Sequence, residues 1–312
     1  MCIRDSFIID HVLAAGAVTT LAGTPGAGKT NLILRFCKAI LAGDESVLGF
    51  AVSVPADFKI AYLTQEAGWT FVPAMQAAGI RTGELYVAQL HRNFETSWQD
   101  SMRDAAAVLS GNGLLVVDTV LDWSGAEDEN DSATMTKVYK HMSGVAGNGV
   151  SVLATTHTRK DFDASSDDVT DIAAVRGSGA VSASSSVVLL YKKPQETSLR
   201  NDDVRYFKIG RSRFGIPGEG SFYARLNDKG ELNRMGKCDL MRSKTRGGEE
   251  KVFEAIAEIE GNGEQATIAL IGKVAGVRRT DAKTALDALE DAERVSHIGK
   301  GVKGDPKVYE TL

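Results

Sequence analysis

The chain has 312 residues, of which 43% are hydrophobic, and its formal net charge is −5. This length allows one large core and a small second domain, and the slightly acidic balance excludes a strongly basic nucleic-acid-binding protein. Three scattered cysteines exclude a disulfide framework and a cysteine-rich metal site. No apolar run approaches the roughly 18–20 residues of a membrane helix, so we expect a cytoplasmic protein.

Residues 1–6 (MCIRDS) match no expected element, and we interpret them as a non-native or truncated leader. Residues 7–235 are expected to form one α/β domain, because β-prone runs alternate with helical patterns. The expected strands are 17–22, 58–64, 85–90, 114–118, 150–155, 187–191, 204–209 and 221–226. The expected helices are 29–41, 98–109 and 132–145. This order predicts a mostly parallel sheet flanked by helices, with an antiparallel edge formed by the last strands.

The C-terminal part of the chain has a different pattern. Residues 236–248 are polar and flanked by glycine, which predicts a linker. Residues 249–312 contain three helical stretches, 249–259, 265–274 and 280–292, and end in two short β-like runs. We therefore expect a small winged helix-turn-helix domain at this end.

A glycine-rich loop, GTPGAGKT, lies between the first expected strand and the first expected helix. This strand–loop–helix order is the setting of a phosphate-binding loop, in which backbone N–H groups and a helix N-terminus face the phosphates. The residues expected to bind nucleotide are Gly23, Thr24, Pro25, Gly26, Ala27, Gly28, Lys29, Thr30 and Asn31. Lys29 is expected to reach the β- and γ-phosphates and Thr30 to bind Mg²⁺, so the loop predicts a site for ATP with Mg²⁺.

Two carboxylates end expected strands at the same edge of the sheet. Asp118 closes the apolar run LLVVD, where an acidic side chain lies beside the phosphate loop and helps to hold Mg²⁺. Glu66 follows the strand at 58–64 and is a candidate for orienting or deprotonating the attacking water. The alternatives are a turn or helix-capping aspartate and a solvated loop glutamate.

Together these motifs resemble the RecA-like P-loop ATPases, also grouped as AAA family ATPases. The resemblance covers roughly residues 8–226, and within this group it is strongest to the RepA-type plasmid helicases and the DnaB-type replicative helicases. Thr64-Gln65-Glu66 resembles the segment that carries the catalytic glutamate in that superfamily. The stretch from Asp118-Thr119 through residues 125–131 (GAEDEND) resembles the RepA-type sequence after the Walker B aspartate.

Two further segments carry the resemblance. The sequence TTHTRK at 155–160 is similar to the RepA-type His-Thr-x-Lys segment, which implies that His157 senses the state of the nucleotide. The sequence GRSRFGIPG at 210–218 is similar to a DnaB-type segment whose two basic residues reach the γ-phosphate of a neighbouring subunit. This implies that Arg213 is an arginine finger and Arg211 its partner, in a homo-oligomeric ring such as a hexamer. A packed histidine and a solvated basic turn are the alternatives.

Candidate DNA contacts follow from the same resemblance. Arg159, Lys160 and Arg176 lie in a segment whose family equivalent faces a central channel that holds single-stranded DNA. Five aspartates in this segment oppose that role, and the alternative for Arg176 is a salt bridge. The aspartates are Asp161, Asp163, Asp167, Asp168 and Asp171.

The expected winged helix offers a second basic surface. Its candidate DNA-binding residues are Arg278, Arg279, Lys283, Lys300 and Lys303. From Gly236 onward, 13 Lys and Arg residues stand against 14 Asp and Glu residues, so the domain is close to neutral. A helix-turn-helix that binds a protein partner, such as a replication protein, or its own neighbours is therefore the alternative.

The sequence as a whole predicts a ring-forming ATPase that acts as a replicative DNA helicase of a plasmid, phage or related element. One alternative is a RecA-like regulatory ATPase that does not unwind DNA. Another is a DNA-binding replication protein that uses ATP only to assemble and reads DNA with its winged helix. Phosphoryl transfer to a small molecule is less expected, because the sequence shows no lid or acceptor site.

Overall fold

A computed structural model describes residues 6–90, 96–126, 128, 131–158, 175–194, 203–215, 220–227, 232–235, 237–302 and 305–312; the side chains of residue 178 and of residues 237–247 are outside that description. The chain divides into two compact units. The first is formed by the chain up to Pro194 together with the stretch that ends at Arg234, and the second by the chain from Met235 to Leu312.

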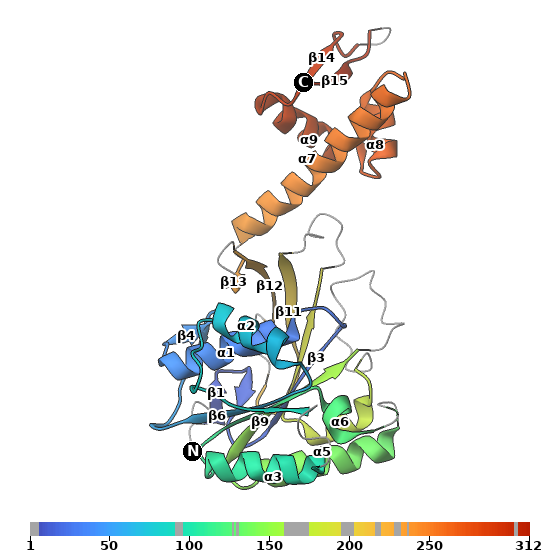
Figure 1. The fold of residues 1–312 in the computed structure, drawn as a ribbon. Coiled ribbons are helices and arrows are strands. Elements are labelled where there is room, and N and C mark those ends of the chain that lie inside the picture. Colours follow the sequence, from blue (N-terminus) through green and yellow to red (C-terminus); the bar gives the residue numbers. More distant parts are fainter. Residues whose placement is uncertain are drawn as a thin grey trace. The chain divides into compact units, whose positions relative to one another are not determined.

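In the described part of the chain, the first unit is built on a nine-stranded sheet (Figure 1). From edge to edge its strands are β13 (Leu232–Arg234), β12 (Ser221–Leu226), β11 (Val204–Ser212), β10 (Val187–Lys192), β3 (Val18–Gly23), β9 (Val150–His157), β8 (Gly113–Asp118), β6 (Lys59–Thr64) and β7 (Tyr86–Gln89). The run from β10 to β7 is parallel, and β11, β12 and β13 add to it antiparallel. This confirms the expected mostly parallel sheet with an antiparallel edge.

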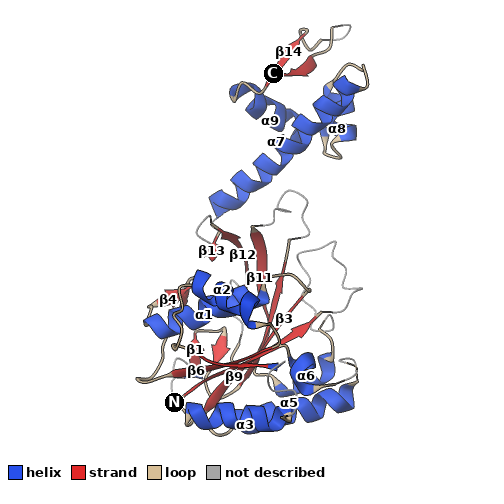
Figure 2. Ribbon diagram, viewed as in Figure 1, coloured by secondary structure: helices blue, strands red, loops and turns tan. Residues whose placement is uncertain are grey.

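Helices cover both faces of this sheet (Figure 2). They are α1 (Lys29–Ala42), α2 (Gly68–Ala77), α3 (Trp98–Leu109), α4 (Val120–Ser124), α5 (Ser132–Ala146) and α6 (Ser178–Ser184). One buried cluster contains side chains of α1 and α2, and a second contains side chains of α3, α4, α5 and α6. The central strands β3, β8 and β9 are buried along almost their whole length, because they are covered on both faces.

Several short elements have no counterpart among the expected ones. They are the hairpins β1 (Phe7–Ile9) with β2 (Leu13–Ala14) and β4 (Ser46–Val47) with β5 (Phe50–Ala51), the edge strand β13, and the helices α2, α4 and α6. Two or three residues are too few to show a period, so such hairpins are fixed by tertiary contacts. Gly68 and Pro73 inside α2 argue against a helix at the sequence level, although a helix forms there.

The second unit contains α7 (Lys237–Gly261), α8 (Ile268–Val274), α9 (Arg279–Asp291) and an antiparallel pair, β14 (Val295–Ile298) with β15 (Val308–Thr311). Its own core joins Val252 and Ile256 of α7, Ile271 of α8, Leu286 of α9 and Tyr309 of β15. These are the three helices and the hairpin expected from the sequence.

The expected linker at 236–248 is corrected by the structure. From Lys237 onward this stretch forms the first half of α7, so one helix continues into the segment expected to begin at residue 249. Lys, Leu, Met and Arg are good helix formers, and they outweigh the two adjacent glycines that suggested an irregular linker.

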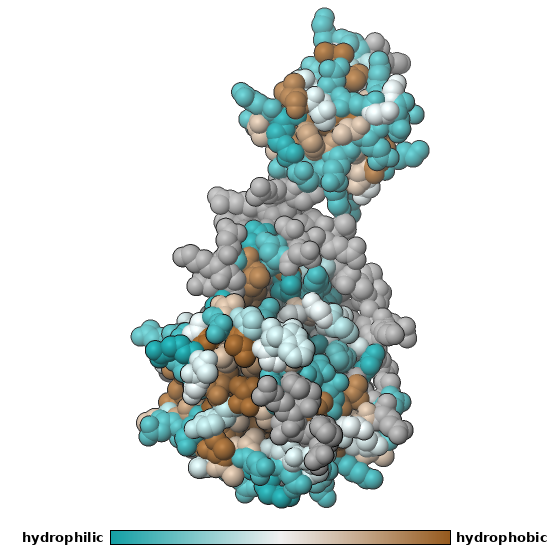
Figure 3. All heavy atoms as spheres, viewed as in Figure 1, coloured by the Kyte–Doolittle hydropathy of each residue, from teal (hydrophilic) through white to brown (hydrophobic). Residues whose placement is uncertain are grey.

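The surface and the helices can be compared with what a membrane-spanning segment needs. Hydrophilic side chains cover most of the second unit on the face drawn in Figure 3. Among the described helices, none combines the length and the apolar composition that crossing a membrane requires.

Candidate nucleotide-binding site

The phosphate loop lies where β3 ends and α1 begins. β3 ends at Gly23 and α1 starts at Lys29, so residues 24–28 connect a buried strand to the N-terminus of a 14-residue helix. Gly26 and Gly28 have φ values of 72° and 90°, which residues with a Cβ adopt rarely. At Gly23 a Cβ would lie 2.2 Å from the carbonyl oxygen of Tyr191 on β10. Three loop glycines are therefore required by backbone conformation or by close packing.

Lys29 is buried, and its ammonium group lies at the loop itself. Its Nζ donates hydrogen bonds to the carbonyl oxygens of Gly23, at 3.1 Å, and Thr24, at 3.4 Å. The side chain of the neighbouring Asn31 is exposed on α1. A lysine at this point places its positive charge next to the N–H groups of the loop and the positive end of the helix dipole.

Asp118 is the centre of a network of hydroxyl groups at the carboxyl end of β8. Its Oδ2 accepts hydrogen bonds from Thr30 and from Tyr62, both at 2.9 Å, and its Oδ1 accepts one from Thr155 at 2.7 Å. Its side chain is 4% exposed. Burial, and after it the charge of Asp118, raises the pKa of Tyr62 well above its ordinary value, so the phenol remains a donor.

Glu66 lies just beyond the end of β6, the strand next to β8. The register pairs Thr64 with Asp118, and the Glu66 backbone N–H donates to the Thr64 hydroxyl at 3.0 Å. Burial, and after it the Asp118 charge, raises the pKa of Glu66, and contacts with the Thr70 and Thr30 hydroxyls oppose that shift. A carboxylate whose pKa is moved toward neutrality next to a second acid has the properties of a general base.

His157 ends β9 directly beside the phosphate loop, because the parallel register pairs it with Gly23. Its carbonyl oxygen accepts a hydrogen bond from the backbone N–H of Arg176 at 3.1 Å. Thr158 and Val175 form a bridge at the same place. The chain thus moves away from the phosphate loop after His157, and Arg176 brings it back beside His157. Arg159 and Lys160 lie outside the described residues.

Arg211 and Arg213 lie at the opposite end of the sheet from the phosphate loop. Strand β11 is antiparallel to β10, and the registers place Ser212 level with Thr19 at the start of β3. The guanidinium groups of Arg211 and Arg213 donate to the carbonyl oxygens of Ser182 and Ala183 in α6. The structure does not bring these two arginines to the phosphate loop of their own chain.

The basic residues expected on the C-terminal unit are exposed. Arg278 occupies the N-cap position of α9, Arg279 and Lys283 follow on the helix, and Lys300 comes after β14. Lys303 lies outside the described residues.

Arg205 and Tyr62 were not expected at the site from the sequence. Arg205, at the start of β11, donates from Nε to the carbonyl oxygen of Ala27 in the phosphate loop at 2.7 Å. Tyr62 sits inside an apolar strand and looks like a core residue. For Arg205 the sequence carries no signal, because it is 178 residues from Ala27. For Tyr62 the sole signal is a hydroxyl on a strand that ends near Glu66.

The described residues fit a magnesium ion and a triphosphate. Mg²⁺ prefers oxygen ligands and is usually held by one or two carboxylates together with substrate phosphates. The Thr30 hydroxyl and the Asp118 carboxylate supply such oxygens side by side. In the part of the chain that the structure describes, no cluster of three or more His, Cys, Asp or Glu side chains forms a separate metal site.

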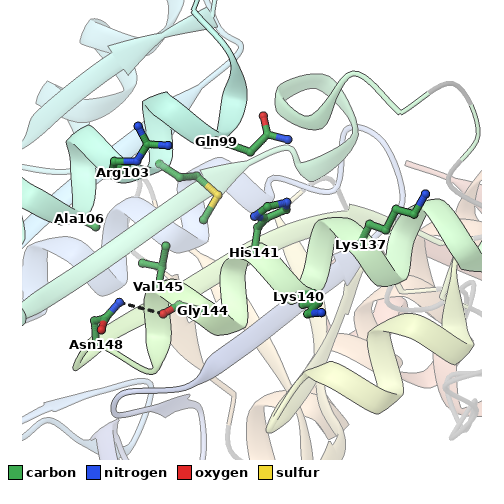
Figure 4. A pocket seen from close by; sticks show the side chains of 10 residues that line it. Gln99, Arg103, Ala106, Lys137, Lys140, His141, Gly144, Val145 and Asn148 are labelled. Carbon is green, nitrogen blue, oxygen red and sulfur yellow. Dashed lines mark hydrogen bonds between the residues drawn. The ribbon is translucent and has the colours of Figure 1, made fainter.

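A groove of about 690 Å³ lies away from these residues, between α3 and α5 (Figure 4). Arg103, Lys137 and His141 line it together with the apolar side chains of Met102 and Val145. None of the site residues expected from the sequence lines this groove.

Comparisons with known proteins place this site in a family. No curated protein matches the chain. A solved structure described as "Crystal structure of the RadB recombinase" is similar to it, with a TM-score of 0.49 and 18% sequence identity, over 72% of this chain and 93% of that chain. The family model described as "AAA domain" matches residues 5–163, a region that holds the phosphate loop, Glu66, Asp118 and His157. The chain therefore belongs to the AAA domain family, as its loop, its carboxylates and its parallel sheet indicate.

Proposed function

We propose that this protein is an ATP-hydrolysing RecA-like motor that forms rings and acts as a DNA helicase in the replication of a plasmid, phage or related element. The observation that carries the ATPase part is the meeting of Thr30 and Asp118 at 2.9 Å, with Glu66 beside them. Three residues from separate strands and a helix converge there, as a hydrolytic phosphate site requires.

The roles of the residues follow from their positions. The loop N–H groups and Lys29 bind the phosphates, while Thr30 and Asp118 hold Mg²⁺. When bound, Mg²⁺ neutralises charge on the β- and γ-phosphates. Glu66 orients the water that attacks the γ-phosphate in line and takes up its proton. His157, next to the loop, senses the nucleotide and passes its state to the segment that begins at Thr158.

The ring is proposed from Arg211 and Arg213. Both lie at the far end of the sheet from the phosphates of their own chain, so their proposed target is the γ-phosphate of a neighbouring subunit. An arginine is suited to this because its rigid guanidinium stabilises charge on a transferring phosphoryl group. Single-stranded DNA would pass through the channel of the ring near Arg159, Lys160 and Arg176.

The C-terminal unit is proposed to be a winged helix-turn-helix joined to a RecA-like domain at 7–235. Its three helices and hairpin support this reading, and so do the exposed Arg278, Arg279 and Lys283 near the start of α9. These residues, with Lys300 and Lys303, would contact DNA or a replication protein.

A second candidate is a regulatory ATPase, or a DNA-binding replication protein assembled by ATP, that does not unwind DNA. The bonds from Arg211 and Arg213 to α6 of the same chain favour it. The five aspartates between residues 161 and 171 favour it as well, because they repel a phosphodiester chain.

The two candidates separate when ATP hydrolysis is measured with and without single-stranded DNA at low salt. The motor is expected to speed up at least about threefold, because DNA in the channel completes the working ring. Mass measurement of the same sample in ATP is expected to show a closed oligomer. A monomer whose rate ignores DNA would overturn the helicase proposal and leave the regulatory ATPase.

A further inference from the structure

Arg205 connects the antiparallel extension of the sheet to the phosphate loop. It is the second residue of β11, and β10 lies between that strand and β3. Its Nε donates to the carbonyl oxygen of Ala27, in the loop that follows β3, at 2.7 Å. Its Nη1 donates to the carbonyl oxygen of Val204 at 2.9 Å. The guanidinium group is therefore held at two of its nitrogens.

The bond to Ala27 acts on the part of the loop that faces phosphate. The carbonyl of Ala27 and the N–H of Gly28 belong to one planar trans peptide, so the two groups point in opposite directions. When Arg205 holds the carbonyl toward β11, the Gly28 N–H is directed away from β11. Phosphate loops bind their ligand through such N–H groups, and a hydrogen bond from a charged donor is stronger than a neutral one.

The peptide between Ala27 and Gly28 gains from an external hydrogen bond, because Gly28 has a left-handed backbone conformation. Its φ is 90°, and glycine can adopt many other backbone conformations as readily as this one. Fixing the loop in this conformation therefore costs much backbone entropy. A Cβ on Gly28 would lie 3.8 Å from Arg205 Nε, which shows that the guanidinium packs against the loop as well as bonding to it. Arg205 therefore offsets part of the cost of fixing the loop before nucleotide binds.

The surroundings of Arg205 explain why an arginine serves here. Tyr191 on β10 is buried, and burial raises its pKa while the Arg205 charge opposes that shift. The carbonyl of Tyr191 in turn approaches Gly23 at the start of the loop. A lysine would keep the charge but would lack the planar fork that bonds Ala27 and Val204 together.

We propose that Arg205 is a positioning residue of the triphosphate site, which fixes the Ala27–Gly28 peptide with its N–H toward the phosphates and adds a positive charge behind the loop. This inference rests on the proposed ATP site. Arg205 acts on the ground-state complex as much as on the transition state, because the loop cradles the phosphates in both. Its removal therefore raises KM and weakens nucleotide binding more than it lowers kcat.

The test is calorimetric titration of the full chain with MgATP, together with steady-state hydrolysis, for wild type, Arg205→Ala and Arg205→Lys. The matched control is Arg234→Ala, which removes an arginine of the same sheet extension whose guanidinium stacks on Phe222, 4.7 Å from the ring centre. Thermal unfolding of each variant without nucleotide shows whether it is folded.

Arg205→Ala is expected to weaken MgATP binding and to raise KM about tenfold or more, with kcat changed less than about threefold. Arg205→Lys is expected to recover part of the affinity, and Arg234→Ala to bind within about twofold of wild type. Folded Arg205 variants that bind MgATP as wild type does would overturn the inference and leave the ATP site standing. A wild-type chain that binds no MgATP would overturn the proposed function and this inference with it.

Discussion

The carboxylate of Asp118 is buried and accepts hydrogen bonds from three hydroxyl groups, those of Thr30, Tyr62 and Thr155. A buried carboxylate without partners would be costly, so these hydroxyls offset the cost of burying Asp118 and hold it oriented beside the loop. Thr30 belongs both to this network and to the phosphate loop, so a metal held by Thr30 is already next to its carboxylate.

Tyr62→Phe is expected to lower the free energy of unfolding by about 1.5–3 kcal/mol, because it removes a buried hydrogen bond to a charged group. Tyr86→Phe is the matched control, since Tyr86 on β7 is 50% exposed, and its cost is expected to stay within about 0.5 kcal/mol. Urea unfolding of the nucleotide-free protein measures both. Equal stabilities of the two variants would show that the Asp118 network contributes nothing to the fold.

The environment of Glu66 carries a cost in stability. The pKa of Glu66 in the folded chain is raised, by burial first and by Asp118 second. A raised pKa means that this group favours the fold when it is protonated, and that this contribution is lost as pH rises through the folded pKa. The ionised form, which the proposed general base requires, is therefore the one that burial disfavours.

At the scale of elements, long periodic segments are readable from the sequence. Helix α3 has the expected bounds, 98–109, and strand β8 starts one residue before the expected 114. Helix α3 has a helical period and a clear start signal in Ser97, whose side chain caps the helix by accepting from the Asp100 N–H. Strand β8 is instead marked by a continuous apolar run that ends in an aspartate. Helix α6 is not predicted from the sequence, because its Ser-, Gly- and Ala-rich sequence has no apolar stripe. Its packing against α5 is a tertiary contact that no local pattern shows.

The candidate site is also predicted in part from the sequence. The loop, Glu66 and Asp118 each follow from a motif at the end of a strand, and the parallel sheet brings them to one edge. Arg205 and Tyr62 depend on which strands become neighbours, which local patterns do not specify. That β11 returns its first residues to the phosphate loop is a property of its antiparallel pairing with β10.

Strand β11 also carries Arg211 at its other end, with Arg213 just beyond it. If these arginines serve the neighbouring subunit, a mixture of Arg213→Ala and Lys29→Ala chains is expected to regain ATPase activity. Some interfaces would then join the intact loop of the first variant to the intact arginine of the second. Activity of the mixture above the sum of its separate components measures this.

The matched control for that experiment is a mixture of Lys29→Ala and Glu66→Gln chains. Lys29 and Glu66 belong to the same half of the site, so no interface of this mixture has both intact on one chain. We expect no recovery there. Recovery in the control mixture, or none with Arg213→Ala, would argue against an arginine supplied by a neighbour.

At the scale of the whole molecule, the chain joins an AAA domain to a smaller unit with its own core. The net charge of −5 gives no general attraction for DNA, so any binding must come from local clusters such as Arg278, Arg279 and Lys283. The residues of the proposed ATP site, by contrast, all belong to the first unit. The central claim is therefore that the chain hydrolyses ATP with Glu66 as the base.

The most direct test is Mg²⁺-dependent ATP hydrolysis by the full chain beside its Glu66→Gln variant, from about pH 5 to pH 9. The wild-type rate is expected to fall on the acid side with a midpoint above the ordinary glutamate pKa of about 4.3, because Glu66 must be ionised. Glu66→Gln is expected to bind MgATP as wild type does and to lose at least about 100-fold in turnover. A Glu66→Gln chain that hydrolyses ATP at the wild-type rate would contradict the account.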